Sequence, residues 1–394
     1  MFKKYFSFLV VLCCLNYSFS QVSSTSNLSN SSQISIITSG PGDVLYEKFG
    51  HTAIRVKDPV SNLDLIYNYG IFDFDNPSFY ADFTKGYMKY KLARYPFYLA
   101  LKSSQQDQRW VKEQVLNLTQ QQRNQFFQFL ETNALPENAG YFYDPFFDNC
   151  ATKPRDIIQQ ILGNKLIFNE SFISENLSLR QLMNKEIHPN TWGSLGINIA
   201  LGSKLDKIAT PNEYLYLPDY VFNALNLSKV IKDGKEENLV LKSNTLLDFE
   251  EKKSTSDLIS PFLVVLLISL LGIFITYKDL KNDKRTKWLD VTLFFFSGVT
   301  GFLIFYLWFF TNHSTAPNNF NFLWAFAPNI VLSFYLSKDK IPDWVLKYIK
   351  LLLLLLFIIP IIWVTHIQLF SIALIPLFIL LGIRYWFLQK TLNS

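Results

Sequence analysis

The hydrophobic pattern of the chain changes near residue 259, where short apolar stretches give way to long unbroken ones. A helix needs about 20 mainly apolar residues to cross a bilayer. Five stretches have adequate length, at about 259–277, 288–311, 320–337, 346–365 and 367–387. The pattern therefore predicts an all-α transmembrane bundle of about five helices, preceded by a separate and more polar domain.

Upstream of this bundle, apolar positions alternate with polar ones, as expected for strands with one buried face. His51–Val56 is such a stretch, and Leu63–Tyr69 returns after a turn as its partner. His51 thus opens one strand of a predicted hairpin, with Asn68 or Tyr69 roughly opposite. Two further strands are predicted at 34–38 and 88–95.

Two helices are predicted further along the chain, after the strands. Thr119 and Gln122 form a capping-box pair at the start of one helix. A second helix follows Cys150, because apolar residues recur every three or four positions over 157–162 and Gly163 ends the run. Cys150 therefore lies at, or just inside, the first turn of this second helix.

The first 33 residues predict export rather than a folded element. Residues 1–20 carry an N-terminal lysine pair, an apolar core and small residues at the end, which is typical of a secretory signal peptide. An uncleaved membrane anchor is the alternative. Residues 21–33 are rich in Ser, Asn and Thr and predict a flexible leader. The rest divides into an exported domain at 34–250 and a transmembrane domain at 251–394.

The basic residues indicate how the chain is oriented. The connection at 278–287 is rich in Lys and Arg, whereas the loops at 312–319 and 365–366 contain neither. Basic loops remain in the cytoplasm, so the N-terminal domain is expected outside the cytoplasmic membrane. The net charge of +5 fits this topology better than nucleic-acid binding, which would need a basic stripe on a soluble face.

The cysteines leave one thiol in the mature chain. Cys13 and Cys14 lie in the first apolar run, and only Cys150 remains, so no internal disulfide is possible. A lone exported thiol can be reactive, can pair between chains, or can be a small buried side chain.

The position of Cys150 favours the reactive alternative. A helix start and neighbouring cations lower the pKa of a thiol, and a partner imidazole completes its activation. His51 is the best-placed histidine, because it opens a strand after a glycine, a position from which papain-like folds present their base. The others lie before a proline in a loop-like stretch (His188), in the exported membrane loop (His313) and at a membrane edge (His366).

A third residue is expected to orient the imidazole. Asn68 is our prediction because of its position across the hairpin, and Asp73 and Asp75 are alternatives. No His, Asp and Cys cluster has metal-ligand spacing, and no G-x-S-x-G motif marks a serine nucleophile. No metal and no cofactor are therefore expected.

Several segments together resemble a known family. They are Phe-Gly-His-Thr-Ala-Ile-Arg-Val at 49–56, Tyr-Asn-Tyr-Gly-Ile-Phe-Asp-Phe at 67–74 and Phe-Asp-Asn-Cys-Ala-Thr-Lys-Pro-Arg at 147–155. Further similar segments lie at 178–180, 198–202, 217–220 and, in the membrane part, at His313 and 321–324. This combination resembles the Lnb lipoprotein N-acyltransferases of Bacteroidota.

The resemblance implies a fold and an activity. The fold would be α+β, a permuted papain-like (NlpC-type) cysteine domain followed by the transmembrane bundle. The activity would transfer a fatty acyl chain from a membrane phospholipid, through a Cys150 thioester, to the N-terminal cysteine amine of a diacylglyceryl lipoprotein. The location would be the bacterial inner membrane, with the catalytic domain facing the periplasm.

The expected site follows from these assignments. Cys150 would be the nucleophile, His51 the base and Asn68 its orienting partner. Substrate contacts or support for these residues are expected from Asn149, Thr152, Arg155, Tyr69, Glu47 and His313. His313 and Trp324 would line the access from the membrane.

Two other functions remain open from the sequence. A membrane-anchored Cys–His amidase or peptidase acting on peptidoglycan would use the same two residues, although a wall hydrolase needs only a single anchor. A non-catalytic membrane scaffold would use Cys150 and His51 only as packing residues.

Overall fold

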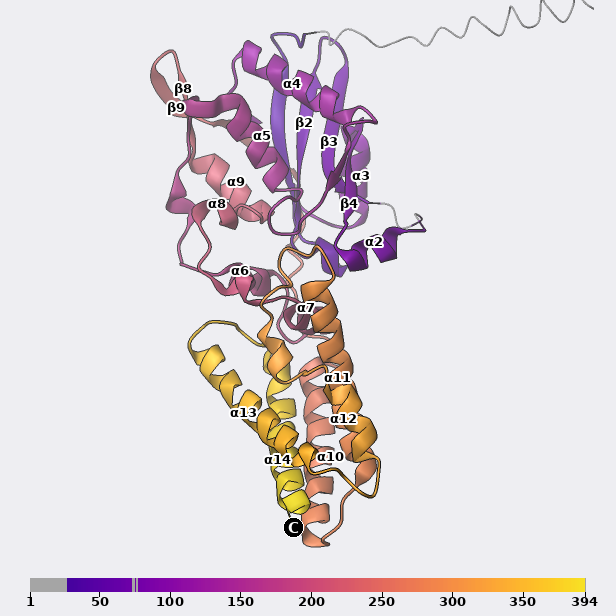
Figure 1. Ribbon diagram of the computed structural model, residues 1–394. Coiled ribbons are helices and arrows are strands. Elements are labelled where there is room, and N and C mark those ends of the chain that lie inside the picture. The colour runs from indigo at the N-terminus through magenta and orange to yellow at the C-terminus, as the bar shows by residue number, and fades with distance from the viewer. Residues whose placement is uncertain (1–26, 73–74, 76, 394) are drawn as a thin grey trace, which may run out of the picture.

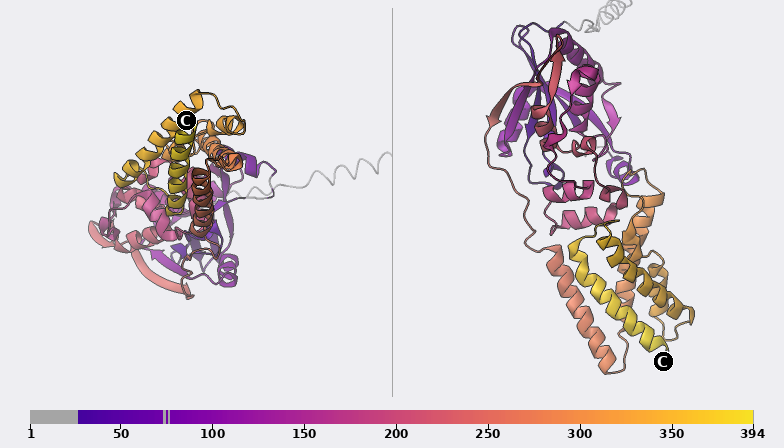
Figure 2. Two further views of the ribbon diagram at one scale, coloured as in Figure 1. Left: turned by 90° about the horizontal axis from the view of Figure 1, so that it is seen from below. Right: turned by 90° about the vertical axis from the view of Figure 1, so that its left-hand side faces the viewer.

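The computed structural model of this 394-residue chain describes residues 27–393 except 73, 74 and 76. A sheet domain and a helical bundle follow one another along the long axis of the molecule (Figure 1). The C-terminus lies at the end of the bundle farthest from the sheet domain, in agreement with the side view in Figure 2. The predicted signal peptide at 1–20 lies outside the described residues.

The predicted flexible leader at 21–33 is wrong from residue 27 onward. Leu28 is buried in the domain core, and its backbone N–H donates to Asn124 Oδ1 at 2.9 Å. The Ser29 hydroxyl donates to Asp58 Oδ1 at 2.6 Å. One apolar side chain and these polar contacts hold a segment whose composition alone predicts flexibility.

A seven-stranded antiparallel sheet forms the centre of the first domain, in the order β10-β5-β1-β2-β3-β4-β6. Its strands are β1 (Gln33–Ser39), β2 (His51–Asp58), β3 (Leu63–Ile71), β4 (Lys89–Pro96), β5 (Val111–Leu116), β6 (Gly140–Phe142) and β10 (Val240–Leu247). The predicted hairpin is confirmed as β2 and β3, with Ile54 paired to Tyr67. The strands predicted at 34–38 and 88–95 are confirmed as β1 and β4.

Helices cover both faces of this sheet. One face packs against α4 (Gln120–Ala134), α5 (Thr152–Leu162) and α9 (Pro218–Leu227), and the other against α3 (Phe97–Gln106). The alternation along β2 and β3 explains the two layers, since Ile54 and Tyr67 enter the first core while Ala53 and Ile66 enter the second. The sheet is therefore buried on both sides.

The two predicted helices are confirmed, the first at its start and the second also at its end. Thr119 and Gln122 form the capping box of α4. α5 begins at Thr152, two residues after Cys150, and Gly163 caps its end. Pro154 lies in the first turn of α5, where a missing N–H costs no intrahelical hydrogen bond.

The remaining elements of the first domain are short. They are α2 (Phe79–Lys85), α6 (Leu179–Glu186), α7 (Trp192–Ala200), α8 (Pro211–Tyr214), the 3-10 turns η2 (Leu45–Glu47), η3 (Gly163–Lys165), η4 (Glu170–Phe172) and η5 (Ser203–Asp206), and the small sheet β7 (Leu166–Ile167), β8 (Lys229–Lys232) and β9 (Lys235–Asn238). The predicted domain boundary at 250/251 falls between β10 and the first bundle helix.

Within the described residues, four helices are long and apolar enough to cross a membrane, rather than the five predicted. They are α10 (Pro261–Lys281), α11 (Lys287–Phe309), α13 (Trp344–Val364) and α14 (Ile375–Asn393), the last preceded by η7 (Ile372–Leu374). The predicted span at 320–337 is instead the turn η6 (Phe320–Leu323) followed by the eight-residue helix α12 (Asn329–Leu336). Pro328 lies between them and interrupts a continuous helix.

The interrupted segment still carries the chain from one end of the bundle to the other. At its start, Asn319 Nδ2 donates to the Ile199 carbonyl of the sheet domain at 2.7 Å. At its end, Arg285, in the connection between α10 and α11, donates to the Leu336 carbonyl at 2.5 Å. The loop at 312–319 therefore lies against the sheet domain, as the charge pattern predicts, and the C-terminus lies at the opposite end (Figure 1).

The sheet domain and the helical bundle pack closely against each other at Gly202. Its N–H donates to the Thr315 carbonyl at 2.8 Å, and a Cβ at this position would lie 1.9 Å from the Pro317 carbonyl oxygen. Only a residue without a side chain allows the loop after α11 to approach this closely.

Gly202→Ala is therefore expected to destabilise the protein, lowering its thermal midpoint by roughly 3 °C or more, since overpacking costs about 1–3 kcal/mol. Gly196→Ala is the matched control, because a Cβ there meets nothing within 4 Å and alanine favours the helix. Thermal unfolding of both variants in detergent measures the difference. Equal midpoints for the two variants would show that the junction tolerates the extra methyl group.

Candidate active site

Cys150 lies in a tight turn immediately before α5. Asp144 and Asp148 form an antiparallel bridge that closes the loop in front of it. The Asn149 side-chain oxygen accepts the backbone N–H groups of Ala151 and Thr152, each at 2.9 Å. This cap satisfies the first amides of the helix and fixes the turn that carries the thiol.

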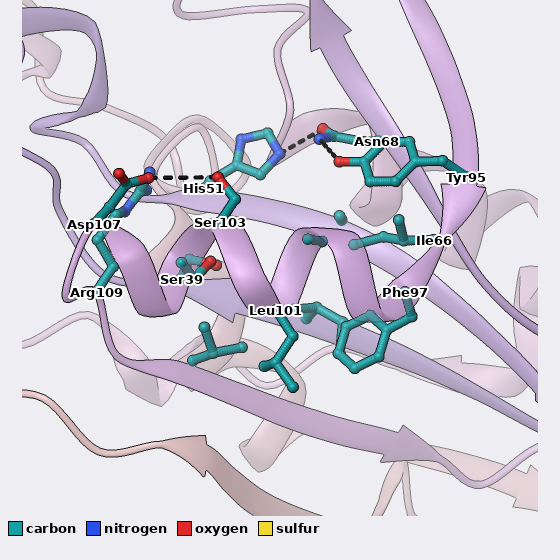
Figure 3. Close-up of a pocket in the computed structure, with 15 residues that line it drawn as sticks. Ser39, His51, Ile66, Asn68, Tyr95, Phe97, Leu101, Ser103, Asp107 and Arg109 are labelled. Atoms are coloured by element: carbon teal, nitrogen blue, oxygen red, sulfur yellow. Dashed lines mark hydrogen bonds between the residues drawn. The ribbon is translucent and has the colours of Figure 1, made fainter.

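His51 opens β2 and is oriented by its neighbours on β3 and β4 (Figure 3). Its Nε2 lies 2.6 Å from Asn68 Oδ1. Asn68 Nδ2 donates to the Tyr95 hydroxyl at 2.9 Å, which turns the amide oxygen toward the imidazole. Nε2 therefore carries the proton, and Nδ1 is the ring nitrogen left for the thiol.

The Cys150 thiol meets the imidazole and two further donors. Burial raises the pKa of Cys150, but the charge and hydrogen bond of His51, the backbone N–H of Thr52 and the Tyr143 hydroxyl outweigh it, so the pKa is lowered below its ordinary value. All three contacts stabilise a thiolate. The site thus favours the nucleophilic form of the sulfur.

The pKa of the His51 imidazole shifts in the opposite direction to that of the thiol. Burial lowers the pKa of His51, and the charge of Arg109 acts the same way, but Cys150 and the hydrogen bond to Asn68 raise it above its ordinary value overall. A lowered thiol pKa beside a raised imidazole pKa is the signature of an ion pair between the two groups.

A backbone bulge in β3 makes room for this arrangement. The β3–β4 register shifts between Asn68 and Ile71, and Gly70 adopts a positive φ of 95°. A Cβ on Gly70 would lie 3.2 Å from the Tyr143 ring and 3.8 Å from Cys150 Cβ. The glycine therefore lets the cysteine loop pack directly over the end of the sheet.

A cavity of about 120 Å³ opens beside His51, between the sheet and α3. Its lining combines apolar and polar side chains, and the polar ones include Ser39, Asn68, Tyr95, Ser103, Ser104, Asp107 and Arg109 (Figure 3). Arg109 Nε donates to the Gly40 carbonyl at 2.7 Å, and its Nη1 lies 3.8 Å from Glu47. The base therefore has a small pocket on the side away from α5.

Three of the predicted residues thus meet in one place: Cys150, His51 and Asn68. Asn149 and Thr152 are also at the site, where both are buried and hold the turn that carries the thiol. Among the described residues, no group of three or more His, Cys, Asp or Glu side chains could hold a metal ion. The arrangement is suited to nucleophilic catalysis through sulfur.

Comparison with known families gives two matches that together extend over both parts of the chain. Residues 19–185 match the model described as the Lnb N-terminal periplasmic domain, and residues 252–392 match the model described as the Lnb transmembrane domain. The chain belongs to the Lnb family. Its first domain is periplasmic, and its second is a membrane domain.

Searches of curated proteins and of solved structures each found no match to the chain. The α+β architecture is confirmed by the sheet domain itself. The permuted papain-like assignment of this Lnb domain stays a prediction.

Two predicted support residues of the Lnb domain lie away from the thiol. Arg155 is buried on α5, and its Nη1 donates to the Asn212 carbonyl at 2.9 Å, which ties α5 to α8. Tyr69 is buried in the core beneath α4, where its hydroxyl accepts from Asn133 at 2.9 Å. Both side chains therefore support the fold around the site rather than face the sulfur.

The predicted contribution of the exported loop also needs correction. Trp324 is buried within the bundle, and its indole N–H donates to Asn321 at 2.9 Å, so it lines no access path. His313 packs against α2, with its ring 6.2 Å from that of Phe83. The loop reaches the cysteine turn through another residue, because the Ser314 hydroxyl donates to Asp144.

Sequence reasoning missed the residues that complete the site. Tyr143 contacts the sulfur, and Tyr95 orients Asn68. Tyr95 was detectable in part, because it ends the strand predicted at 88–95. Tyr143 lies in an irregular loop, and only its place seven residues before Cys150 hinted at proximity.

Asn68→Ala should reduce the rate of any reaction that proceeds through the Cys150 thiolate by about 10- to 100-fold. One hydrogen bond to a charged imidazole contributes about 1.5–3 kcal/mol. Tyr95→Phe should cause a smaller loss, since Asn68 keeps its oxygen but loses the group that orients it. Both variants should also shift the pH profile of turnover, which a purely structural defect would leave in place. Tyr98→Phe, on the exposed side of α3, is the control; an Asn68→Ala profile identical to wild type would exclude an orienting role.

Proposed function

We propose that this protein is a lipoprotein N-acyltransferase. It would move a fatty acyl chain from a phospholipid, through a Cys150 thioester, to the N-terminal cysteine amine of a diacylglyceryl lipoprotein. The observation that carries the proposal is an activated Cys150–His51–Asn68 array in the periplasmic domain of an Lnb chain, tied to its membrane domain. The membrane concerned would be the bacterial inner membrane.

In the first half-reaction, the Cys150 thiolate attacks the ester carbonyl carbon of the phospholipid. The carbon–oxygen ester bond breaks, and the His51 imidazolium gives its proton to the departing glycerol oxygen. The products are a Cys150 thioester and a lysophospholipid. Asn68 keeps the imidazole in the orientation from which Nδ1 can transfer this proton.

In the second half-reaction, the lipoprotein amine attacks the thioester carbonyl. Neutral His51 takes a proton from the nitrogen, the carbon–sulfur bond breaks, and the thiolate–imidazolium pair is restored. A thioester suits this order of events, because it reacts with amines yet persists while the second substrate docks.

Two donors beside the sulfur would stabilise the oxyanion of each tetrahedral intermediate. The Tyr143 hydroxyl already contacts the sulfur, and the Cys150 N–H has no acceptor among the described residues. Donors held in place before the reaction cost no reorganisation in the transition state. We assign them as the oxyanion-stabilising pair.

Complementation tests the proposal directly. The full chain is expressed in a bacterial strain that lacks lipoprotein N-acylation, and the N-terminal peptide of a lipoprotein is examined by mass spectrometry. The expected product carries a third, amide-linked acyl chain. A peptide that stays diacylated with well-expressed protein would overturn the proposal, and release of peptidoglycan fragments instead would identify a wall amidase.

A further inference from the structure

Five large apolar side chains are exposed at the end of the periplasmic domain that faces the bundle. Val44, Leu45 and Tyr46 lie at the turn η2, and Tyr80 and Phe83 lie on the short helix α2. Their exposed fractions range from 42% for Leu45 to 69% for Tyr80. We call these five residues the aromatic lip. Such a set in water is unfavourable and marks an interaction surface.

The two parts of the lip are joined by ring contacts. Tyr46 meets Phe72 edge-on, with ring centres 5.5 Å apart, and Phe72 stacks on Phe79 at 5.8 Å. Phe79 in turn stacks on Phe83 at 6.2 Å. η2 and α2 therefore present one continuous surface rather than two separate patches.

The lip lies at the level where the spanning helices end. The Asn312 N–H, three residues after α11, donates to the Lys85 carbonyl at the end of α2 at 2.9 Å. A Cβ on Gly86 would lie 2.6 Å from the His313 nitrogen, so α2 rests directly on the loop that follows α11. Figure 1 shows α2 immediately above α11.

The other half of the lip lies toward α10. Leu45 packs on Gly193 at the start of α7, where a Cβ would come within 2.7 Å of its side chain. The neighbouring Trp192 indole donates to the Ile259 carbonyl at 2.9 Å, two residues before α10 begins. The lip thus extends between the periplasmic ends of α10 and α11, whose main packing partners are other helices, α14 and α12 respectively.

Ring contacts also continue from the lip to the catalytic sulfur. Phe72 lies 5.0 Å from Tyr90, and Tyr90 stacks on Tyr143 at 4.5 Å. The Tyr143 hydroxyl then contacts Cys150. A series of ring contacts therefore connects the bundle end of the domain with Cys150.

We propose that the aromatic lip inserts into the outer interfacial layer of the bilayer and guides an acyl chain from that layer to Cys150. The occupant is the lipid surface itself. Aromatic side chains favour the headgroup region, and the exposed Phe309 and Phe310 at the end of α11 continue the same belt. The guiding role rests on the proposed acyltransferase function, whereas the membrane contact does not.

Spin-label accessibility tests the contact independently of catalysis. The full chain, with Cys13, Cys14 and Cys150 replaced by serine, carries a nitroxide at Tyr80→Cys or at Tyr98→Cys in vesicles of phosphatidylethanolamine and phosphatidylglycerol. Tyr98 is the matched control, because it is equally exposed on α3, on the same domain but away from the bundle (65% against 69%).

The label at position 80 should collide mainly with oxygen, which concentrates in lipid, and the label at position 98 mainly with a water-soluble nickel chelate. Equal nickel accessibility at both positions would overturn the proposal. Shielding of position 80 from both reagents, with broadening between labels, would overturn it in favour of a second copy of the chain.

A rate comparison tests the guiding role. Tyr80→Ser with Phe83→Ser should lower acyl transfer from bilayer phospholipid by about tenfold, which is 1.4 kcal/mol, and leave transfer from a short-chain, monomeric ester unchanged. The exposed α3 pair, Tyr98→Ser with Leu99→Ser, should change neither rate. Equal losses with both donors would refute the guiding role. If the wild-type protein transferred an acyl chain from neither donor, the acyltransferase proposal would be refuted. The spin-label result would then decide the membrane contact by itself.

Discussion

Replacing Cys150 with alanine is expected to abolish acyl transfer, with a loss on the order of 10⁴-fold or more. In the proposed mechanism the thiolate forms the covalent intermediate, so no neighbouring group can take over its role. Cys150→Ser should be nearly as inactive, because a hydroxyl beside His51 does not ionise as the thiol does. The measurement is the fraction of a lipoprotein N-terminal peptide that carries the third acyl chain.

Stability provides the control for this loss. Cys150 is small and buried, and the cap of the turn is made by Asn149, so alanine should keep the fold and change the unfolding free energy by only about 1 kcal/mol. Wild-type protein incubated with phospholipid should also yield a fatty acyl group on the Cys150 peptide that neutral hydroxylamine removes. Triacylated lipoprotein made by the alanine variant would exclude Cys150 as the nucleophile.

The local elements were predictable because their signals are short-range. The hairpin of β2 and β3 follows from alternation on either side of a turn, and the start of α4 from the capping box of Thr119 and Gln122. The same reasoning placed Cys150 at the first turn of a helix, within two residues of the observed start of α5, and brought His51 and Asn68 onto adjacent strands. The choice of His51 as the partner of Cys150 also relied on the position from which papain-like folds present their base.

In the membrane domain, composition alone was insufficient to predict which apolar segments form continuous spanning helices. Residues 320–337 are apolar enough for a span, but hydropathy does not distinguish a continuous helix from a buried irregular segment. Asn321 and Asn329 lie inside this segment with their amides hydrogen-bonded to the sheet domain and to the Ser297 hydroxyl. These hydrogen bonds, together with Pro328, stabilise an interrupted helix in this segment. The interruption depends on tertiary contacts that hydropathy does not report.

Tyr143 was not predictable for a similar reason. It approaches the sulfur because Gly70 has a positive φ and no Cβ, which lets the loop before α5 pack over the sheet end. Neither the bulge nor the loop has a periodic sequence signal. The donors around the thiol therefore depend on packing between segments that carry no local sequence signal.

His51→Gln is expected to lower acyl transfer by about 10²- to 10⁴-fold and to change its pH dependence. In wild type the rate should rise as Cys150 loses its proton, at a pH below the ordinary thiol pKa, because His51, Thr52 and Tyr143 outweigh the effect of burial. It should fall again as His51 loses its proton, above the ordinary imidazole pKa. Glutamine has no proton to lose in this range, so the alkaline fall should disappear.

Alkylation of the thiol by iodoacetamide at a series of pH values measures the first of these ionisations without any substrate. Removing the imidazole leaves burial, which raises the pKa of Cys150, opposed only by Thr52 and Tyr143. The inflection should therefore move to higher pH in His51→Gln. His188→Gln is the control, since His188 lies between α6 and α7 and accepts the Asn190 N–H at 3.1 Å, and its alkylation curve should match wild type. Superimposable curves for His51→Gln and wild type would show that the imidazole does not set the charge of the sulfur, and the base would then have to be sought elsewhere.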